Sequence, residues 1–407
     1  MRILAIETSC DETAISIIEA DEFKPGALIR VLSNVVLSQV AKHAEYGGVF
    51  PSLAVREHSK SLVPVLKKSL EEAGMLHLEP NAQNSPSTSL RIPRNSRDKF
   101  EILNSILERE QILREQFLAF VPGVRKPDID AVAVTSGPGL EPTLWVGINF
   151  AKALATIWDL PIIPVNHMEG HLLSALLEKG VEKNFEFRIS NLEFPALALL
   201  ISGGHTELVL IHDWLKYEIV GQTKDDAVGE AFDKAARMMG LPYPGGPAIS
   251  RLAKSYTPKA KSISLPRPMI DSGDFNFSFS GLKTAVLYRL KEFPEITEEL
   301  RCEMSHEFEE AATEVLVKKT LAAAEHYGTK TILVGGGVSA NDRIKEVLIE
   351  ESAIQNPEVR VLYAPRELTG DNALMIAVAA WVRHSLTGEK AIQPLDSISA
   401  NGNIRLS

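Results

Sequence analysis

The sequence has few cysteines and no long apolar run. Cys10 and Cys302 are its two cysteines, in a chain of 407 residues. Two thiols cannot form the disulfide framework of a small secreted domain, so we expect a reducing compartment. No apolar run reaches the roughly 20 residues that a membrane-spanning helix needs, and the N-terminus lacks the pattern of a signal peptide. These absences predict a cytoplasmic protein with no membrane anchor.

An excess of positive charge is also lacking. The chain carries 43 Lys and Arg against 53 Asp and Glu, a formal net charge of -10. This balance argues against a broadly basic face for nucleic acid, although it leaves room for a local basic patch. A hydrophobic fraction of 45% is ordinary for a globular protein, and the length suits two lobes better than one core.

Two segments share one pattern, which suggests two lobes of related design. Residues 2–18 read as a strand, a polar turn and a second strand, and residues 196–211 repeat this order. Helical periodicity follows each hairpin, as over residues 52–74, and a further strand is predicted at 131–134. Strands separated by helices predict an α/β fold.

An insertion interrupts this pattern. Residues 79–97 are rich in Pro, Ser, Asn and Arg and read as a loop, and the spacing then predicts one amphipathic helix over 98–120. Its apolar stripe consists of Ile102, Leu103, Ile106, Leu113 and Phe117. Basic side chains in this stretch could contact RNA or could belong to a solvated loop; they are Arg91, Arg94, Arg97 and Lys99.

His167 and His171 are spaced to lie on one face of a helix. Two imidazoles at i and i+4 can ligate one metal ion, although such pairs are also common in cores and on surfaces. Gly170 between them indicates that the backbone approaches another element closely. A two-histidine site needs a third ligand, and Asp371 is the candidate. Asp371 also reads as an N-cap of the helix that begins at Ala373, and both roles can hold.

Several glycine-rich turns follow apolar runs. They include Gly203-Gly204, Gly245-Gly246 and Gly335 to Gly337. Such turns expose backbone N–H groups that can bind phosphate, or they are tight turns that need glycine for its backbone freedom. None has the spacing of a P-loop or a dinucleotide fingerprint. Their number favours a nucleotide-sized ligand.

Two further segments carry a polar side chain for which two roles are possible. The spacing predicts a helix over 225–240, on which Asp233 could bind ribose hydroxyls or join a surface ion pair. Residues 275–284 alternate aromatic and polar side chains, which predicts a half-buried strand. Lys283 in that segment could meet a phosphate or remain a surface lysine.

Nine ordered motifs resemble the TsaD family, the bacterial and organellar branch of the tRNA threonylcarbamoyladenosine transferases. The resemblance covers nearly the whole chain except about residues 78–127. The motifs are Ile6 to Thr13, His43 with Tyr46 to Val49, Arg56 to His58, Gly137 to Leu140, His167 to His171, Ser202 to Thr206, Glu230 to Lys234, Phe279 to Thr284 and Gly335 to Asn341.

The resemblance implies an actin-like, hexokinase-like α/β fold with two lobes and a cleft between them. The first lobe would be residues 1–165, with the insertion 78–127, completed by a C-terminal helix over 373–407. The second would be residues 166–372. Ala14 departs from the family, which commonly has glycine there, and Ser52 stands where a glutamate is usual.

The activity implied is transfer of a threonylcarbamoyl group from threonylcarbamoyl-AMP to N6 of adenine 37, in tRNAs that read codons beginning with adenine. One divalent metal ion per subunit is implied, iron(II) or alternatively zinc. Its ligands would be His167, His171 and Asp371. The adenylate would lie against Leu200, Ile201, Ser202, Gly203, Gly204, Asp233, Gly246 and Asn341.

By position in matching motifs, Glu12 and His43 are the acid/base candidates. The implied partners are the tRNA anticodon loop, a TsaB-like paralogue and a TsaE-like ATPase. Two alternatives compete with the transferase: another actin-like kinase or ATPase, in which the histidine pair would have no role, and a non-catalytic scaffold paralogue, which generally lacks those histidines. An endopeptidase is rejected because the segment is not a His-Glu-x-x-His helix.

Overall fold

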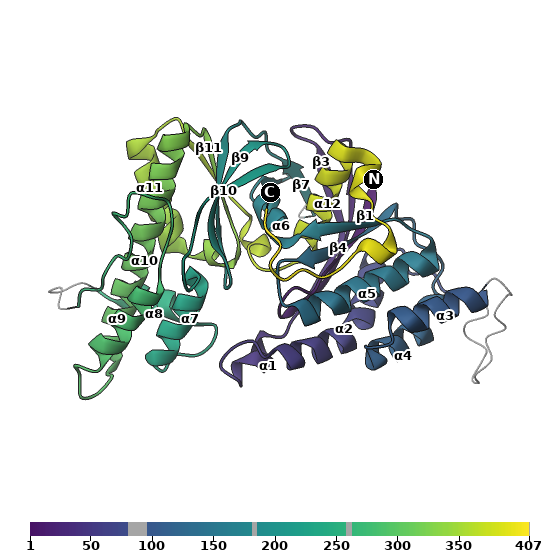
Figure 1. Ribbon diagram of the computed structural model, residues 1–407, viewed down its shortest axis with the longest axis horizontal. Coiled ribbons are helices and arrows are strands. Elements are labelled where there is room, and N and C mark those ends of the chain that lie inside the picture. Colours follow the sequence, from purple (N-terminus) through teal and green to yellow (C-terminus); the bar gives the residue numbers. More distant parts are fainter. Residues whose placement is uncertain (80–95, 181–184, 258–262, 407) are drawn as a thin grey trace.

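The computed structural model describes residues 1–79, 96–180, 185–257 and 263–406 (Figure 1). Within them the chain forms two β-sheets, one in each lobe. The first has the order β5-β4-β1-β2-β3-β7-β6 and the second β10-β9-β8-β11-β12. The strands of the first sheet are β1 Arg2–Glu7, β2 Glu12–Ala20, β3 Leu28–Ser38, β4 Ala131–Gly137, β5 Ile162–Asn166, β6 Leu177–Lys179 and β7 Glu186–Ile189. Those of the second are β8 Ala196–Ile201, β9 Thr206–Asp213, β10 Lys216–Gln222, β11 Thr331–Gly335 and β12 Arg360–Tyr363.

The two sheets share one topology. In the first, β1, β2 and β3 are antiparallel neighbours, and β4 and β5 continue parallel to β1. In the second, β8, β9 and β10 are antiparallel, and β11 lies parallel between β8 and β12. Each lobe thus repeats a hairpin-led unit of the same strand order. The prediction of a two-lobed, actin-like α/β fold is confirmed.

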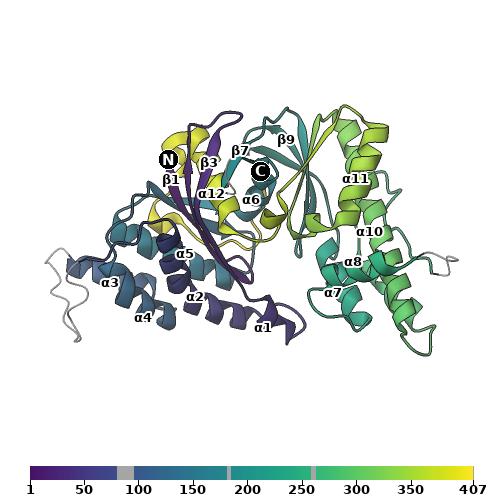
Figure 2. The same cartoon turned by 180° about the vertical axis from the view of Figure 1, so that it is seen from behind.

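Helices cover both faces of each sheet. In the first lobe they are α1 Val40–Ala44, α2 Pro51–Glu72, α3 Ser96–Ile106, α4 Gln111–Phe120 and α5 Glu141–Trp158. Between the sheets lie α6 His167–Ser174 and α12 Ala373–Thr387, and the second lobe carries α7 Val228–Met238, α8 Gly245–Ser255, α9 Ser280–Leu290, α10 Glu298–Tyr327 and α11 Asp342–Gln355. Figure 2 shows the same layers from behind.

The strands are buried on both faces, so their sequences are apolar runs. In β1, Ile3 and Ala5 face a central core that contains α6 and α12, whereas Leu4 and Ile6 face the core under α2 and α5. The second sheet contributes its alternate residues to the same central core. The central core therefore joins the two lobes, and α6 lies within it.

Close approach of α6 to its neighbours requires glycine. A Cβ on Gly170 would come within 3.0 Å of Met375 Cγ on α12. A Cβ on Gly335, at the end of β11, would lie 2.5 Å from the carbonyl oxygen of His171. The backbone approach predicted at Gly170 is therefore the packing of α6 on α12.

The strands β6 and β7 extend the first sheet. β7 pairs with β3, and β6 pairs with β7. They lie beyond residue 165, and α12 packs against β1 and β2 of the same sheet. The lobe boundaries at 165 and 372 stay predictions, because sheet pairing by itself does not divide a chain into domains.

Three predicted elements are wrong in form. The C-terminal helix predicted over 373–407 ends at Thr387, where Gly388 follows, and the remaining helical residues up to residue 406 form only short 3-10 turns. The helix predicted over 98–120 is two helices, α3 and α4, separated by a turn at residues 107–110. The strand predicted over 275–284 is a single bridge at Phe277 followed by α9. Asp225 accepts hydrogen bonds from the N–H groups of Phe279 and Ser280, and this begins the helix. Arg91 and Arg94 lie outside the described residues.

Candidate functional site

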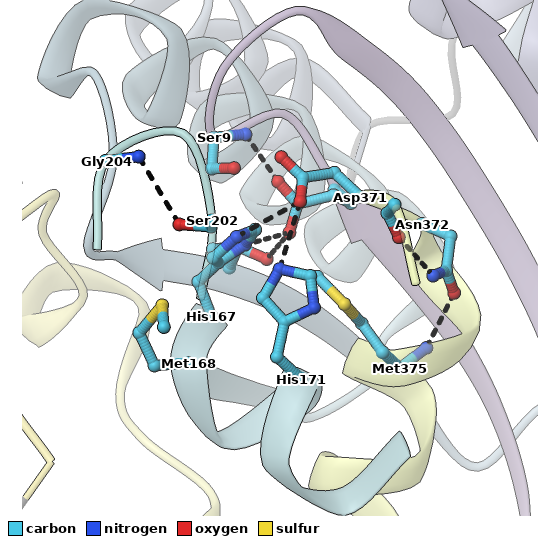
Figure 3. A network of polar contacts seen from close by, with 12 residues as sticks. Ser9, His167, Met168, His171, Ser202, Gly204, Asp371, Asn372 and Met375 are labelled. Atoms are coloured by element: carbon cyan, nitrogen blue, oxygen red, sulfur yellow. Dashed lines mark hydrogen bonds and ion pairs between the residues drawn. The ribbon is translucent and has the colours of Figure 1, made fainter. Parts of the chain in front are cut away.

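Two histidines and a carboxylate converge between the lobes (Figure 3). His167 is the first residue of α6 and His171 follows one turn later, with ring centroids 4.7 Å apart. The Nε2 atoms of His167 and His171 lie 3.4 and 3.1 Å from Oδ1 of Asp371. One ligand atom from each of the three residues fits within a 4.8 Å span. The spacing that the sequence showed thus produces a real cluster.

Asn372, and not Asp371, caps α12. The Asn372 side chain accepts a hydrogen bond from the N–H group of Met375 at 3.0 Å, as an N-cap does. The capping role read for Asp371 is therefore wrong. Because its neighbour satisfies the helix end, the Asp371 carboxylate points to the histidines.

Glu7 holds His167 from the other side. Its Oε2 lies 3.1 Å from Nδ1 of His167 and accepts from the Thr135 hydroxyl at 2.5 Å, while its Oε1 accepts from the Ser9 N–H group. A carboxylate on Nδ1 places the ring proton there and leaves Nε2 free as a ligand. Glu7 is completely buried. Sequence reasoning assigned it no role, although its place at the end of an apolar strand was a signal.

The charges of this cluster support each other. Burial opposes a charge on His167, but Asp371 and Glu7 outweigh it and raise the pKa of that ring well above its usual value. Burial likewise opposes the Asp371 carboxylate, yet the two histidines lower its pKa. Burial, followed by the charges of His167 and His171, lowers the pKa of the nearby His205 to about 4. His205 is therefore neutral at pH 7.

The geometry fits a divalent metal ion. Ligand atoms roughly 2.1 Å from a metal lie about 3.0 Å apart in octahedral and about 3.4 Å apart in tetrahedral coordination. Both separations from Asp371 Oδ1 fall in this range, whereas the full set spans up to 4.8 Å and would close slightly around an ion. Two imidazoles and one carboxylate are the ligand set of non-haem iron(II) sites and also suit zinc.

A cavity of about 580 Å³ lies in the second lobe, of the size that holds a nucleotide-sized ligand. Gly203, Asp233, Gly246 and Asn341 are among the residues that line it. The Asp233 carboxylate accepts from the N–H group of Gly245 at 2.6 Å, and burial raises the pKa of Asp233. This hydrogen bond holds the glycine turn at the start of α8 against α7.

The other residues predicted to contact the adenylate lie in β8 and in the turn that follows it. Leu200 and Ile201 are fully buried in β8, so their side chains belong to the core. The Ser202 hydroxyl accepts from the N–H groups of Gly204 and His205, which shapes the turn between the cavity and the histidines. Asn341 caps α11, and its amide donates to Glu309 at 2.7 Å.

Glu12 and His43 lie on the first-lobe side of the site. Burial, followed by the carboxylates of Asp371 and Asp11, raises the pKa of Glu12 to about 9. His43 is fully buried, its Nδ1 accepts from the Phe50 N–H group and its Nε2 lies 3.2 Å from Gln39 Oε1. In this arrangement His43 has no free nitrogen for proton transfer. The acid/base roles of both residues stay predictions.

Carboxylates of the two lobes face one another across the site. Burial, followed by Asp11 of the first lobe and Asp233 of the second, raises the pKa of Tyr243. Tyr243 precedes the Gly245-Gly246 turn of the cavity. Its hydroxyl therefore lies near charged groups of both lobes.

Comparison with known proteins identifies the family. The sequence model of TsaD, tRNA N6-adenosine threonylcarbamoyltransferase, matches residues 30–79 and 110–378. The enzyme of that name from Persephonella marina is 39% identical, over 95% of this chain and 92% of its own length. That from Chromobacterium violaceum is 40% identical, over 94% and 93%. This chain belongs to the TsaD family.

A solved structure shows a more distant likeness. A ROK hexokinase from Thermus thermophilus is 11% identical with a TM-score of 0.44, over 94% of this chain and 97% of its own. Between its two matched stretches the TsaD model leaves residues 80–109 unmatched, a shorter stretch than the insertion predicted at 78–127. Among the described residues, no helix is long and apolar enough to cross a membrane. TsaD membership removes the support for the kinase and scaffold alternatives.

Proposed function

We propose that this chain transfers the threonylcarbamoyl group of threonylcarbamoyl-AMP to N6 of adenine 37, in tRNAs that read codons beginning with adenine. The chain is an acyltransferase by family. The observation that carries the rest is the convergence of His167, His171 and Asp371 beside the second-lobe cavity. The turn formed by Ser202 and His205 connects the two.

His167, His171 and Asp371 would hold one divalent metal ion, iron(II) in our proposal and zinc as the alternative. When bound, such an ion supplies a Lewis acid that polarises a carbonyl or phosphoryl oxygen. Glu7 keeps the His167 proton on Nδ1, so that Nε2 remains available. Analysis of the metal in the purified chain tests the choice of ion.

The second-lobe cavity would hold the adenylate portion of the donor. Gly203, Asp233, Gly246 and Asn341 line it, and exposed N–H groups of glycine turns suit phosphate oxygens. The amide of Asn341 is already bonded to Glu309 and Ser250, so Asn341 shapes the wall. Leu200 and Ile201 contribute through the strand that positions the Ser202 turn.

Glu12 would donate a proton to the departing phosphate of AMP, and the proton that adenine N6 loses as the new N–C bond forms would return to the Glu12 carboxylate. With a pKa near 9 in this chain it carries a proton at neutral pH. Loss of the AMP group develops negative charge, which a proton donor and positioned dipoles stabilise. His43, bonded at both nitrogens, would support the segment that follows β3.

The acceptor is an RNA base that must leave its stack to reach the site, as an anticodon-loop base can. Because the chain is acidic overall, we propose that tRNA binding is shared with a TsaB-like paralogue and a TsaE-like ATPase in the cytoplasm. Tight binding of tRNA by this chain alone at physiological salt would contradict that division of roles.

The transfer assay tests the proposal. The purified chain and its partner proteins are incubated with threonylcarbamoyl-AMP and either unmodified tRNA or the same tRNA with guanine at position 37. Nucleoside mass spectrometry should find the modified adenosine only with adenine at that position. Modification of both tRNAs, or of neither, would reject the assignment.

A further inference from the structure

Two large aromatic side chains are exposed next to the site. Tyr46 and Phe50, in the loop of residues 45–50 between α1 and α2, are 61% and 49% exposed. Their rings are stacked, with centroids 5.4 Å apart and planes 13° from parallel. We call this segment the tip loop. Burial of aromatic rings is favourable, and the outer faces of this exposed pair are available to a planar ligand.

The tip loop is connected to both halves of the site. The N–H group of Gln39, just before α1, donates to the carbonyl of Asp11, and the Ser38 hydroxyl donates to Glu12. On the opposite lobe, Arg237 of α7 donates to the carbonyl of Gly47. Arg237 lies one turn after Asp233, which lines the cavity. Figures 1 and 2 both show α1 at the end of its lobe that faces α7.

A cluster of cations lies on α1 and α2, the helices on either side of the tip loop. Lys42, Arg56 and Lys60 all lie within 4.0 Å of the Glu57 carboxylate, and their side chains are 58%, 64% and 37% exposed. One buried carboxylate thus faces three cations, and Arg237 adds a fourth nearby. The exposed Glu45 opposes them, and Arg56 also lines a cavity with the carboxylates of Glu108, Glu110 and Glu141. The positive charge next to the tip loop therefore rests mainly on Lys42 and Arg237.

Stacked rings with flanking cations are the means by which proteins bind unpaired nucleotides. Bases stack on the aromatic faces while Lys and Arg follow the phosphates. Tyr, Phe and Arg are also enriched in protein interfaces, so a protein partner is the competing occupant that the experiment below separates from RNA. We propose that the tip loop, with Lys42, Arg56 and Lys60, holds unpaired anticodon-loop nucleotides that flank the target adenine. This assignment rests on the proposed function.

The test is a binding titration with a labelled, unmodified anticodon stem-loop RNA and the metal-loaded full chain at low salt. Tyr46→Ala with Phe50→Ala should weaken binding by roughly tenfold or more, since stacking of one base commonly contributes that much. The salt dependence of RNA binding by this double variant should equal that of the wild type. Lys42→Gln should weaken binding less and lower the slope of log affinity against log salt by about 1.

Matched variants separate stacking from folding. Tyr288→Ala removes an aromatic ring that is 63% exposed on α9 and should leave RNA affinity unchanged. Tyr46→Phe with Phe50→Tyr keeps both rings and should bind like the wild type. AMP binding should be equal in all of these variants, because the cavity is intact.

The outcomes distinguish this inference from the proposed function. If the wild type modifies tRNA but the Tyr46→Ala, Phe50→Ala variant binds the stem-loop equally well, the tip-loop assignment is overturned alone. Unchanged RNA affinity together with lost capture of a partner protein would overturn it too and assign the surface to protein binding. A wild type that modifies no tRNA would instead remove the proposed function.

Discussion

Glu7 connects the first strand of the first lobe to the first histidine of α6. It is completely buried, and its two oxygens accept from the Thr135 hydroxyl and the Ser9 N–H group while facing Nδ1 of His167. At the scale of single residues, the orientation of the candidate ligand thus depends on a carboxylate 160 positions away in the chain.

Glu7→Gln should weaken metal binding. The amide no longer fixes the His167 proton on Nδ1, and loss of such a partner commonly costs about 10- to 100-fold in metal affinity. Competition with a chelator measures this directly. Glu110→Gln, a change of a half-buried carboxylate bonded to Asn149, is the control and should keep wild-type affinity. Equal metal affinities in the wild type, Glu7→Gln and Glu110→Gln would show that Glu7 does not position His167.

Ionisation of Glu12 should lower the free energy of unfolding of the metal-free protein as the pH rises. Its pKa is raised from 4.5 to about 9, so the folded chain holds this proton more tightly than the unfolded chain. The stabilisation is complete below about pH 4.5 and is lost as the pH rises through about 9. Thermal unfolding at pH 6 and pH 9 should therefore show a larger fall for the wild type than for Glu12→Gln. Parallel falls would contradict the raised pKa.

At the scale of elements, the residue that caps a helix determines which neighbouring side chain remains available to the site. α12 begins with Asn372 as its cap, which leaves the preceding Asp371 available to the histidines. α10 begins with Thr297, whose hydroxyl accepts from the N–H group of Leu300 at 3.2 Å. Both side chains accept from the third residue of their helix, but Asn372 also donates to the carbonyls of Leu368 and Gly370, and only its cap adjoins the site.

These two caps give a pair of variants to compare. Thr297→Ala should lower the free energy of unfolding by about 1 kcal/mol. Asn372→Ala should lower it by more, because it also removes hydrogen bonds to the carbonyls of Leu368 and Gly370. Only Asn372→Ala should also weaken metal binding, because the backbone that carries Asp371 loses its anchor. Denaturant unfolding and chelator competition measure the two effects. Equal metal affinities would show that the cap does not position Asp371.

The elements show what the sequence could predict. Apolar runs and polar turns located the two hairpins, because strands buried on both faces leave that pattern. The predicted helix over 98–120 failed since Leu107 and Leu113 both enter the core under α2 and α5. Six residues apart, they would point about 120° apart on one helix. The turn between α3 and α4 removes that conflict.

The site was harder to predict than the elements. The i,i+4 spacing located the histidine pair, but Asp371 lies 200 positions from His171 and Glu7 lies 160 from His167. No local pattern reports such contacts, because they follow from the packing of α6 and α12 between two sheets. Asp371 was a candidate ligand from its place between a turn and an apolar helix, and the family resemblance implied the same ligand, whereas Glu7 was given no role.

At the scale of the whole molecule, one buried charge joins three elements. Glu169 of α6 is fully buried, accepts from the Tyr217 hydroxyl of the second sheet at 2.9 Å and pairs with Arg383 of α12 at 2.7 Å. Since α6 and α12 lie between the sheets, this network links the two lobes behind the histidines.

Arg383→Met should destabilise the molecule by roughly 2–3 kcal/mol. It leaves Glu169 buried without its cation, and the Tyr217 hydroxyl compensates only part of the loss. Arg343→Met breaks the more exposed pair with Glu310 and should cost about 1 kcal/mol at most. Denaturant unfolding compares them, and similar losses would show that the buried network contributes no more than a surface pair.

The central claim is that metal binding by His167 and His171 and threonylcarbamoyl transfer occur at one site between the lobes. The most direct test measures metal content and modified adenosine in parallel for the His167→Ala, His171→Ala variant, with His212→Ala as the control. His212 is half exposed and pairs with Glu218. We predict that the double variant loses both metal and transfer while the control keeps both. Full metal content together with full transfer in the double variant would contradict the claim.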